Sequence, residues 1–201
     1  MNKTEKEPLA KVGVKDKAPM SLTGQPCPFC NKNTLTLTEG ESDVPFFGIL
    51  FLFSMHCSSC NYHKSDVEAA DIHEPARYVF TVRTRDDLNA RVVKSSEATL
   101  ILEGLGSVEP GTVSDGYITN TEGIIVRMKQ HIELLKKSSS EDEEIENANK
   151  MLTRIESILH GKESLTITIE DPTGNSAIIA ETAVKEPFEA GKKIKPLRQK
   201  K

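Results

Sequence analysis

The sequence predicts an α+β protein that is mostly β, in which a small cysteine-rich finger precedes a sandwich-like or barrel-like β domain interrupted by a pair of helices. Three observations predict this fold class. All four cysteines lie close together near the start of the chain, short strand-like segments separated by turn residues follow them, and two apolar stripes at helical spacing stand between those segments. The order of these features along the chain defines the expected domains.

The composition is that of a chain that folds in water: 201 residues with 30 acidic and 26 basic side chains. This length suffices for one sizeable domain or two small ones. No run approaches the ~18 consecutive apolar residues that a membrane span needs, and the first residues lack the apolar core of a signal peptide. We therefore expect a cytoplasmic protein with no membrane partner.

Charge is unevenly distributed along the chain. The last ten residues (KKIKPLRQKK) hold six of the 26 basic groups and no acidic one, which leaves 20 basic against 30 acidic groups, a net charge of −10, in residues 1–191. We expect residues 191–201 to form a basic tail on an acidic body. A body of this sign makes nucleic acid unlikely as the main partner, although the tail alone attracts phosphate weakly.

Residues 1–23 mix Lys, Glu and Pro with few large apolar side chains, so we expect a flexible lead. Residues 24–73 contain all four cysteines and five of the seven phenylalanines, which indicates a finger with its own small core. Two strands are expected there, at 34–38 (TLTLT) and 49–56 (ILFLFSMH), and the second is apolar on both faces. One of those faces should pack on the rest of the chain or on a partner.

Residues 74–190 predict the β domain, with a helical hairpin at about 120–160. Strands are expected at 78–83, 91–94, 99–102, 165–170 and 177–180. Capping boxes are expected to start the helices, one formed by Thr119 with Glu122 and the other by Ser140 with Glu143, and Gly161 is expected to end the second helix.

The cysteines form two C-x2-C pairs, and their spacing indicates a metal site. Each pair can wrap its backbone around a metal as a tight knuckle, and the residue after each pair, Asn31 or Asn61, tolerates the left-handed geometry in which such a knuckle often ends. Four thiolates leave no open position on the ion, so the site is expected to be structural and to hold one zinc ion. The expected ligands are Cys27, Cys30, Cys57 and Cys60.

Two alternatives to zinc remain open from the ligands alone. Iron of the rubredoxin kind uses a similar thiolate set, because tetrahedral sulfur ligands suit both metals. A redox dithiol is disfavoured, since two equivalent pairs without a βαβ pattern do not match that motif.

No catalytic residue is expected. His73, His131 and His160 stand without a carboxylate or nucleophile at a telling spacing, and Gly104-Leu105-Gly106 lacks the third glycine and the following helix of a dinucleotide-binding loop. His56 and His63 flank the second knuckle, where either is an alternative to a thiol ligand, but four cysteines already satisfy the ion. The sequence therefore indicates a binding protein, not an enzyme.

The residues from about 24 to 190 resemble the ZPR-type zinc-finger proteins, the zinc-finger-protein-of-the-receptor family, in the single-module form typical of archaea. The marks are the long finger from Cys27 to Cys60 and the segments DVPFF at 43–47, DLNARVVKS at 87–95, TEG at 121–123 and DPTGNS at 171–176. The resemblance implies a zinc ribbon and a jelly-roll-like double-stranded β domain with an inserted helical hairpin. It also implies a role in binding translation elongation factor one-alpha and assisting its folding, whereas the receptor partner of two-module relatives is not expected here.

Our first hypothesis is therefore a zinc-binding protein-interaction module whose partner is a GTPase of the elongation factor one-alpha type. The expected partner-binding residues are Phe46, Phe47, Asn175 and Ser176. The alternative is an RNA- or ribosome-associated zinc-ribbon protein that uses the finger and the basic tail. A run of basic residues near the start of the β domain is a separate candidate surface for an acidic partner or RNA, although charges that alternate along strands usually form a solvated face. That run consists of Arg77, Arg83, Arg85, Arg91 and Lys94.

Overall fold

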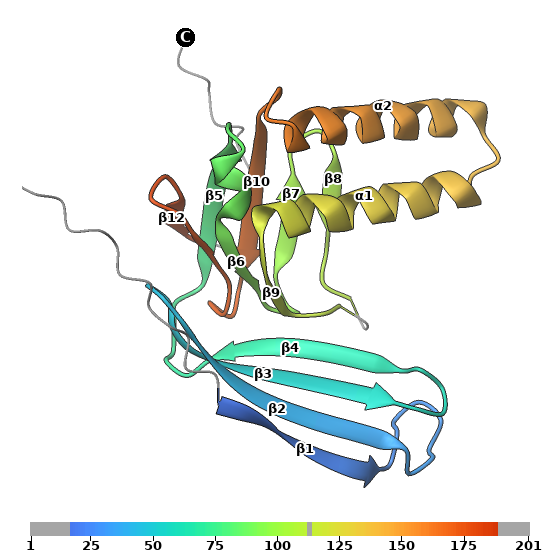
Figure 1. Ribbon diagram of the computed structural model, residues 1–201, viewed down its shortest axis with the longest axis vertical. Coiled ribbons are helices and arrows are strands. Elements are labelled where there is room, and N and C mark those ends of the chain that lie inside the picture. Colours follow the sequence, from blue (N-terminus) through green and yellow to red (C-terminus); the bar gives the residue numbers. More distant parts are fainter. Residues whose placement is uncertain (1–16, 112–113, 189–201) are drawn as a thin grey trace, which may run out of the picture.

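The computed structural model describes residues 17–111 and 114–188 of the chain. Figure 1 shows the finger sheet beneath a β domain, with the helices α1 (Thr121–Ser138) and α2 (Asp142–Leu159) projecting side by side from the upper part of that domain. The architecture is mostly β with a helical hairpin, as predicted. The basic tail expected at 191–201 lies outside the described residues.

The finger is an antiparallel sheet with the strand order β1-β2-β3-β4. Its strands are β1 (Lys17–Gln25), β2 (Leu35–Val44), β3 (Gly48–Cys57) and β4 (His63–Ala69). The two predicted strands are confirmed as β2 and β3, and both are longer than predicted. Residues 17–23, expected to belong to a flexible lead, instead form most of β1. Backbone hydrogen bonds to β2 hold this strand in place. Because such pairing does not require an apolar pattern, the sequence did not indicate a strand here.

One face of the finger sheet packs on the β domain. Leu50 on β3 and Val67 on β4 are buried together with Val44 and with Val93 of the β domain. This contact supplies the cover that the apolar strand 49–56 was predicted to need. The opposite face of β3 is only partly covered, because Ile49 and Phe53 remain 43% and 36% exposed.

The β domain contains a five-stranded and a three-stranded antiparallel sheet. In sheet order the first holds β12 (Val184–Pro187), β5 (Ala76–Val82), β10 (Leu165–Asp171), β7 (Thr99–Leu102) and β8 (Gly106–Val108). The second holds β11 (Ala177–Ile179), β6 (Arg91–Lys94) and β9 (Tyr117–Asn120). A short 3₁₀ helix, η1 (Asp86–Asn89), precedes β6.

Alternation of side chains along β5 and β10 builds the core of this domain. Both strands bury every second residue, and Phe80 faces Ile167 across the pair. Ile124 and Ile155 of the two helices are fully buried in the same apolar cluster. The helical hairpin thus forms one side of the core. Burial of its apolar stripe stabilises both helices, whose other faces are polar.

Both helices begin differently from the predictions. Helix α1 (Thr121–Ser138) is capped by Asn120, whose side chain accepts a hydrogen bond from the Gly123 N–H at 2.8 Å, and not by a box of Thr119 with Glu122. Helix α2 (Asp142–Leu159) starts after Glu141 without a side-chain cap, so the box of Ser140 with Glu143 does not form. Acidic residues at 142–144 still favour this helix terminus through the helix dipole.

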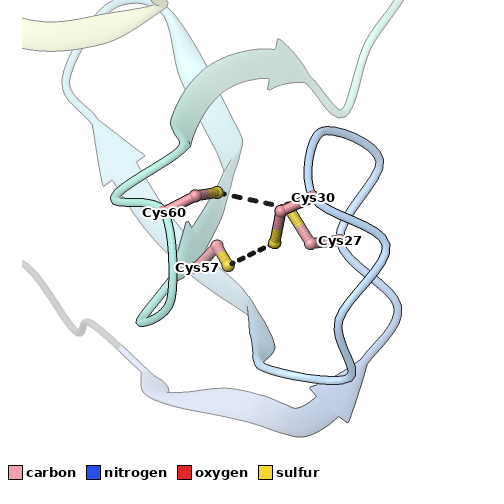
Figure 2. A group of neighbouring side chains, drawn as sticks. All are labelled: Cys27, Cys30, Cys57 and Cys60. Carbon is pink, nitrogen blue, oxygen red and sulfur yellow. Dashed lines mark hydrogen bonds between the residues drawn. The ribbon is translucent and has the colours of Figure 1, made fainter.

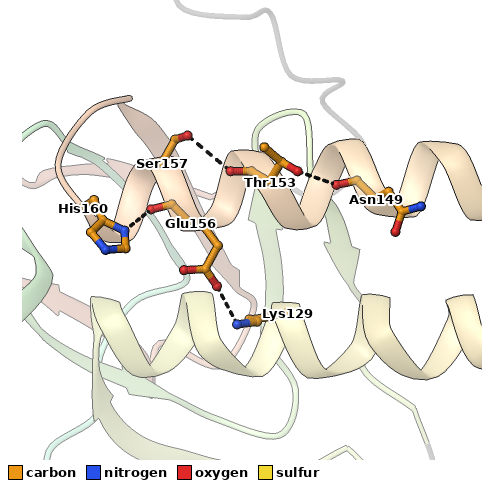
Figure 3. Close-up of polar contacts among 6 residues, drawn as sticks. All are labelled: Lys129, Asn149, Thr153, Glu156, Ser157 and His160. Carbon is orange, nitrogen blue, oxygen red and sulfur yellow. Dashed lines mark hydrogen bonds and ion pairs between the residues drawn. The ribbon is translucent and has the colours of Figure 1, made fainter.

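Polar contacts tie the two helices to each other near the β domain (Figure 3). Lys129 of α1 forms an ion pair with Glu156 of α2 at 2.5 Å, and the backbone oxygen of Glu156 also lies 2.7 Å from Nδ1 of His160. Gly161, with φ of 70°, ends α2 as predicted, because the left-handed backbone there favours glycine. Neither helix of the described residues combines the length and the apolar content that crossing a membrane requires.

Candidate metal centre and interaction surfaces

The two C-x2-C pairs form matching knuckles at the far end of the finger sheet. The Asn31 N–H donates to the Cys27 oxygen and the Asn61 N–H donates to the Cys57 oxygen, each at 2.9 Å. Both asparagines have φ of 58°, which confirms the predicted left-handed positions. The local sequence thus folds each knuckle in the same way and turns both pairs of thiols toward a common point.

The four sulfur atoms lie within 4.8 Å of one another (Figure 2). The Cys27–Cys60 and Cys30–Cys57 sulfur pairs are each 3.7 Å apart. A disulfide requires about 2.05 Å, whereas the edge of a regular tetrahedron with zinc–sulfur bonds of about 2.3 Å is about 3.8 Å. The donor set and its spacing therefore fit one zinc ion bound by four thiolates, with no ligand position left for water or substrate.

Hydrogen bonds prepare one of these thiols for metal binding. The Thr34 hydroxyl lies 3.2 Å from the Cys57 sulfur, and this contact, helped by the backbone amides of Cys60 and Ser59, lowers the pKa of Cys57 to about 6 despite its burial. In Cys60 the Tyr62 amide acts in the same direction, but burial and the neighbouring thiols outweigh it and raise the pKa to about 12. Without a cation, the pKa values of Cys57 and Cys60 thus shift in opposite directions. A bound divalent cation favours the deprotonated form of all four thiols at once.

A small apolar cluster surrounds the metal centre. Cys27, Cys57 and Leu35 are buried together, and the rings of Phe29 and Tyr62, one from each knuckle, stack at 6.2 Å. His63 beside the second knuckle pairs with Asp115 of the β domain at 3.4 Å. Within residues 17–111 and 114–188, no other group of three or more His, Cys, Asp or Glu side chains lies close enough to hold a metal ion.

The two phenylalanines predicted to bind a partner point in different directions. Phe46 is 89% exposed at the turn between β2 and β3, and its φ of 67° is unusual for a bulky residue. Phe47 is half-buried, packs on the apolar clusters and stacks on His73 with ring centres 4.9 Å apart. Phe46 is therefore available to a partner, and Phe47 mainly fixes the turn.

The other two predicted partner-binding residues serve the interior of the chain. Ser176 is fully buried and donates to the Asp171 carboxylate, so the prediction that it contacts a partner is wrong. Asn175 accepts a hydrogen bond from the Ala69 N–H at 3.0 Å and donates to the Thr173 hydroxyl at 3.2 Å. The segment DPTGNS thus joins the β domain to the finger strand β4.

The sequence did not indicate a buried polar network that surrounds Asp171. Ser95 donates to the same carboxylate at 2.8 Å, and the Thr173 N–H donates to its other oxygen at 2.7 Å. The neighbouring Lys94 is also buried, which lowers its pKa, and its ammonium group donates to the Ser95 oxygen at 3.0 Å. Ser95 and Ser176 are 81 residues apart, so the network gave no local signal, because only the fold brings its members together.

Two of the five basic residues near the start of the β domain are held by neighbouring groups, whereas Arg83, Arg85 and Arg91 are exposed. Lys94 is buried, and Arg77 is bound to Glu170, with its Nε and Nη2 atoms 2.8 and 2.6 Å from one carboxylate oxygen. Guanidinium and ammonium groups held in this way cannot follow a phosphate backbone.

The fold and the site define a class of protein: a zinc finger closed by four thiolates and attached to a jelly-roll domain with a helical hairpin. Comparison with known proteins agrees with each part. Residues 20–75 match the ZPR1 zinc-finger domain, and residues 86–193 match the ZPR1 jelly-roll domain. The chain belongs to the ZPR1 zinc-finger family.

Relatives in archaea match along most of their length. The chain is 33% identical to a ZPR1-like protein of Methanocaldococcus jannaschii over 86% of this chain and 88% of the relative. It is 36% identical to one of Pyrococcus horikoshii over 77% and 72%. A protein of Schizosaccharomyces pombe described as a zinc finger chaperone is 30% identical over 76% of this chain but only 33% of its own length. The chain thus corresponds to about a third of that eukaryotic relative.

Proposed function

We propose that the chain is a cytoplasmic, non-enzymatic protein-interaction module that binds a translation elongation factor one-alpha type GTPase and assists its folding. The resemblance to the ZPR-type family supports this partner, and the fission yeast relative described as a chaperone supports the folding role. The closed zinc site supports a structural task for the metal, because catalysis by zinc needs an open ligand position.

The observation that carries the proposal is the exposed ring of Phe46. Residues in left-handed backbone cost about 1–2 kcal/mol unless they are glycine, yet this turn holds a phenylalanine there and presents it to solvent. Ile72, in the neighbouring loop before β5, is fully exposed as well. Exposed aromatic side chains held on a rigid support are typical anchors of protein–protein interfaces.

An RNA partner is less well supported. The finger exposes Glu39, Asp43 and Glu68, and carboxylates on the sheet repel a phosphate backbone. The proposed role therefore relies on an apolar contact, which salt weakens little compared with an electrostatic one.

Binding of purified archaeal elongation factor one-alpha, measured by calorimetry at low and high salt, tests the proposal. We expect binding at both salt concentrations and at least a tenfold loss of affinity in Phe46→Ala, the size typical of an interface anchor. Phe29→Ala is the matched control, because Phe29 is another exposed phenylalanine of the finger, on a zinc knuckle at the opposite end of the sheet. Zinc content is checked in both variants.

Absence of binding by the unaltered protein would contradict the proposal that elongation factor one-alpha is the partner. An equal effect of the two substitutions would overturn Phe46 as the anchor. Recovery of RNA instead of protein, at low salt only, would favour the alternative function.

A further inference from the structure

The outer face of the finger sheet, the face turned away from Val93, carries an apolar ridge. Ile49, Phe51 and Phe53 alternate along β3 on this face, and the rings of Phe51 and Phe53 are in contact, with centres 6.5 Å apart. On β1, Met20 and Leu22 extend the same face, and they are 71% and 56% exposed. Ile49 and Phe53 are 43% and 36% exposed, and exposed apolar patches of this kind mark interaction sites.

Acidic side chains line both sides of this ridge. Strand register places Asp43 of β2 beside Ile49, Glu39 of β2 beside Phe53, and Glu68 of β4 beside Phe51. These three carboxylates are exposed, and none forms an ion pair with another described residue. A segment that combines apolar and basic side chains is therefore the chemical complement of the outer face.

The chain itself carries such a segment. Residues 192–201 read KKIKPLRQKK, in which Ile194 and Leu197 lie among six basic groups. The residue before Pro196 favours β or polyproline II backbone, and the roughly three residues per turn of polyproline II would place Ile194 and Leu197 on the same side of the segment.

The described part of the chain ends close to the finger sheet. The Phe188 N–H, at the end of the described chain, donates to the Pro75 oxygen at 3.2 Å. Pro75 is five residues from Ala70, whose N–H donates to the Ile49 oxygen at 2.9 Å. Five residues span at most about 18 Å, whereas residues 189–201 reach about 45 Å when extended. The segment can therefore reach Ile49 and still run along most of β3, whose ten residues are about 30 Å long.

We propose that the basic segment 192–201 docks on the outer face of the finger sheet of its own chain, with Ile194 and Leu197 on the ridge and the lysines beside Glu39, Asp43 and Glu68. A protein that binds this face has to displace the segment first. The contact is intramolecular, so its test needs no partner protein and is independent of the proposed function.

Zero-length carbodiimide cross-linking of the full chain, followed by peptide mass spectrometry, tests the docking. Carbodiimide joins lysine to a carboxylate only where the two are in contact, so we expect amide links from the segment to Glu39, Asp43 or Glu68. Mixing ¹⁴N-labelled and ¹⁵N-labelled protein separates links within one chain from links between two copies. The double variant Glu39→Lys with Glu68→Lys cannot form links at positions 39 and 68. It should also lose the links to the unaltered Asp43, because it reverses the charge beside the ridge and prevents docking.

The matched control is Glu103→Lys with Glu109→Lys, two exposed acids of the β domain, which should leave the links unchanged. A second readout uses the absence of tryptophan from the chain. Ile194→Trp introduces the only tryptophan of the chain, and its emission should be shifted to the blue and should return to the solvent value in the Glu39→Lys, Glu68→Lys background. Links spread over the β domain, links only between copies, or tryptophan emission at the solvent value from the start would each overturn the proposal.

Discussion

The side chain of Asn175 accepts a hydrogen bond at 3.0 Å from the backbone N–H of Ala69, 106 residues earlier in the chain. Ala69 ends the outer strand of the finger, and Asn175 lies in the turn between β10 and β11 of the β domain. At the other end of the same strand, the Ser65 N–H donates to Asp115 at 2.9 Å and its hydroxyl donates to the Gly116 oxygen at 2.8 Å. The β domain thus satisfies the edge of β4 in place of a fifth strand, which joins finger and domain into one unit.

Asn175→Ala should loosen this junction. Removing the acceptor leaves the Ala69 N–H without its partner, and we expect a loss of about 1–2 kcal/mol in the free energy of unfolding. Denaturant unfolding measures the loss, and amide hydrogen exchange should become faster at Ala69. Asn147→Ala, at an exposed position of α2, is the control. Unchanged exchange at Ala69 would show that the hydrogen bond does not hold the strand.

Gly116→Ala should separate finger and domain by steric conflict. A Cβ at this position would lie 2.8 Å from the Val67 nitrogen and 2.9 Å from the Asp66 Cα, both parts of the rigid strand β4. We expect about 1–3 kcal/mol of destabilisation, typical of overpacking, measured as a fall in the denaturation midpoint. Gly111→Ala is the matched control, because its Cβ would meet nothing within 4 Å. Equal midpoints for the two variants would refute the close approach.

Asp87→Asn should change how stability depends on pH. The Asp87 carboxylate accepts hydrogen bonds from the N–H groups of Arg83 at 2.9 Å and Thr84 at 2.8 Å, and these lower its pKa below the ordinary 3.8. A lowered pKa in the folded state contributes stability that is present above pH 3.8 and is lost as pH falls through the folded-state value. Unfolding measured from pH 6 downward should show a weaker acid dependence in the variant. The same slope in both proteins below pH 4 would contradict the assignment.

The metal centre could be predicted from the sequence because its ligands lie in two short motifs whose local geometry is independent of the rest of the fold. Strands β6 and β7 were predicted with their bounds because each is a short apolar run between polar or turn residues, RVVK and TLIL. Strands β1, β4, β8, β9 and β12 were not predicted. The sequence HKSDVEA of β4 contains no such apolar run, and its pairing with β3 and its contacts with the β domain hold it in place.

The environments of polar residues were harder to predict from the sequence than the metal centre and the apolar strands. Ser176 was predicted to contact a partner because a β-turn at 171–174 does not account for it, and nothing near it in sequence indicates that Ser95 and Asp171 enclose it. The N-cap of α1 is Asn120 and not the predicted Thr119 for a similar reason. Thr121, the first residue of the helix, bonds through its hydroxyl to the Asp87 oxygen and so fixes where the helix starts.

The central claim is that zinc bound by four thiolates holds the finger in the form that presents its surfaces. Elemental analysis of the purified chain, combined with hydrogen exchange before and after removal of metal by a chelator, tests it most directly. We predict one zinc ion per chain, no zinc in Cys57→Ser, and loss of amide protection at the knuckles and in β2 and β3 after chelation, while β5 and β10 stay protected. A chain that holds no zinc, or holds iron in its place, or keeps the finger protected without metal would contradict the account.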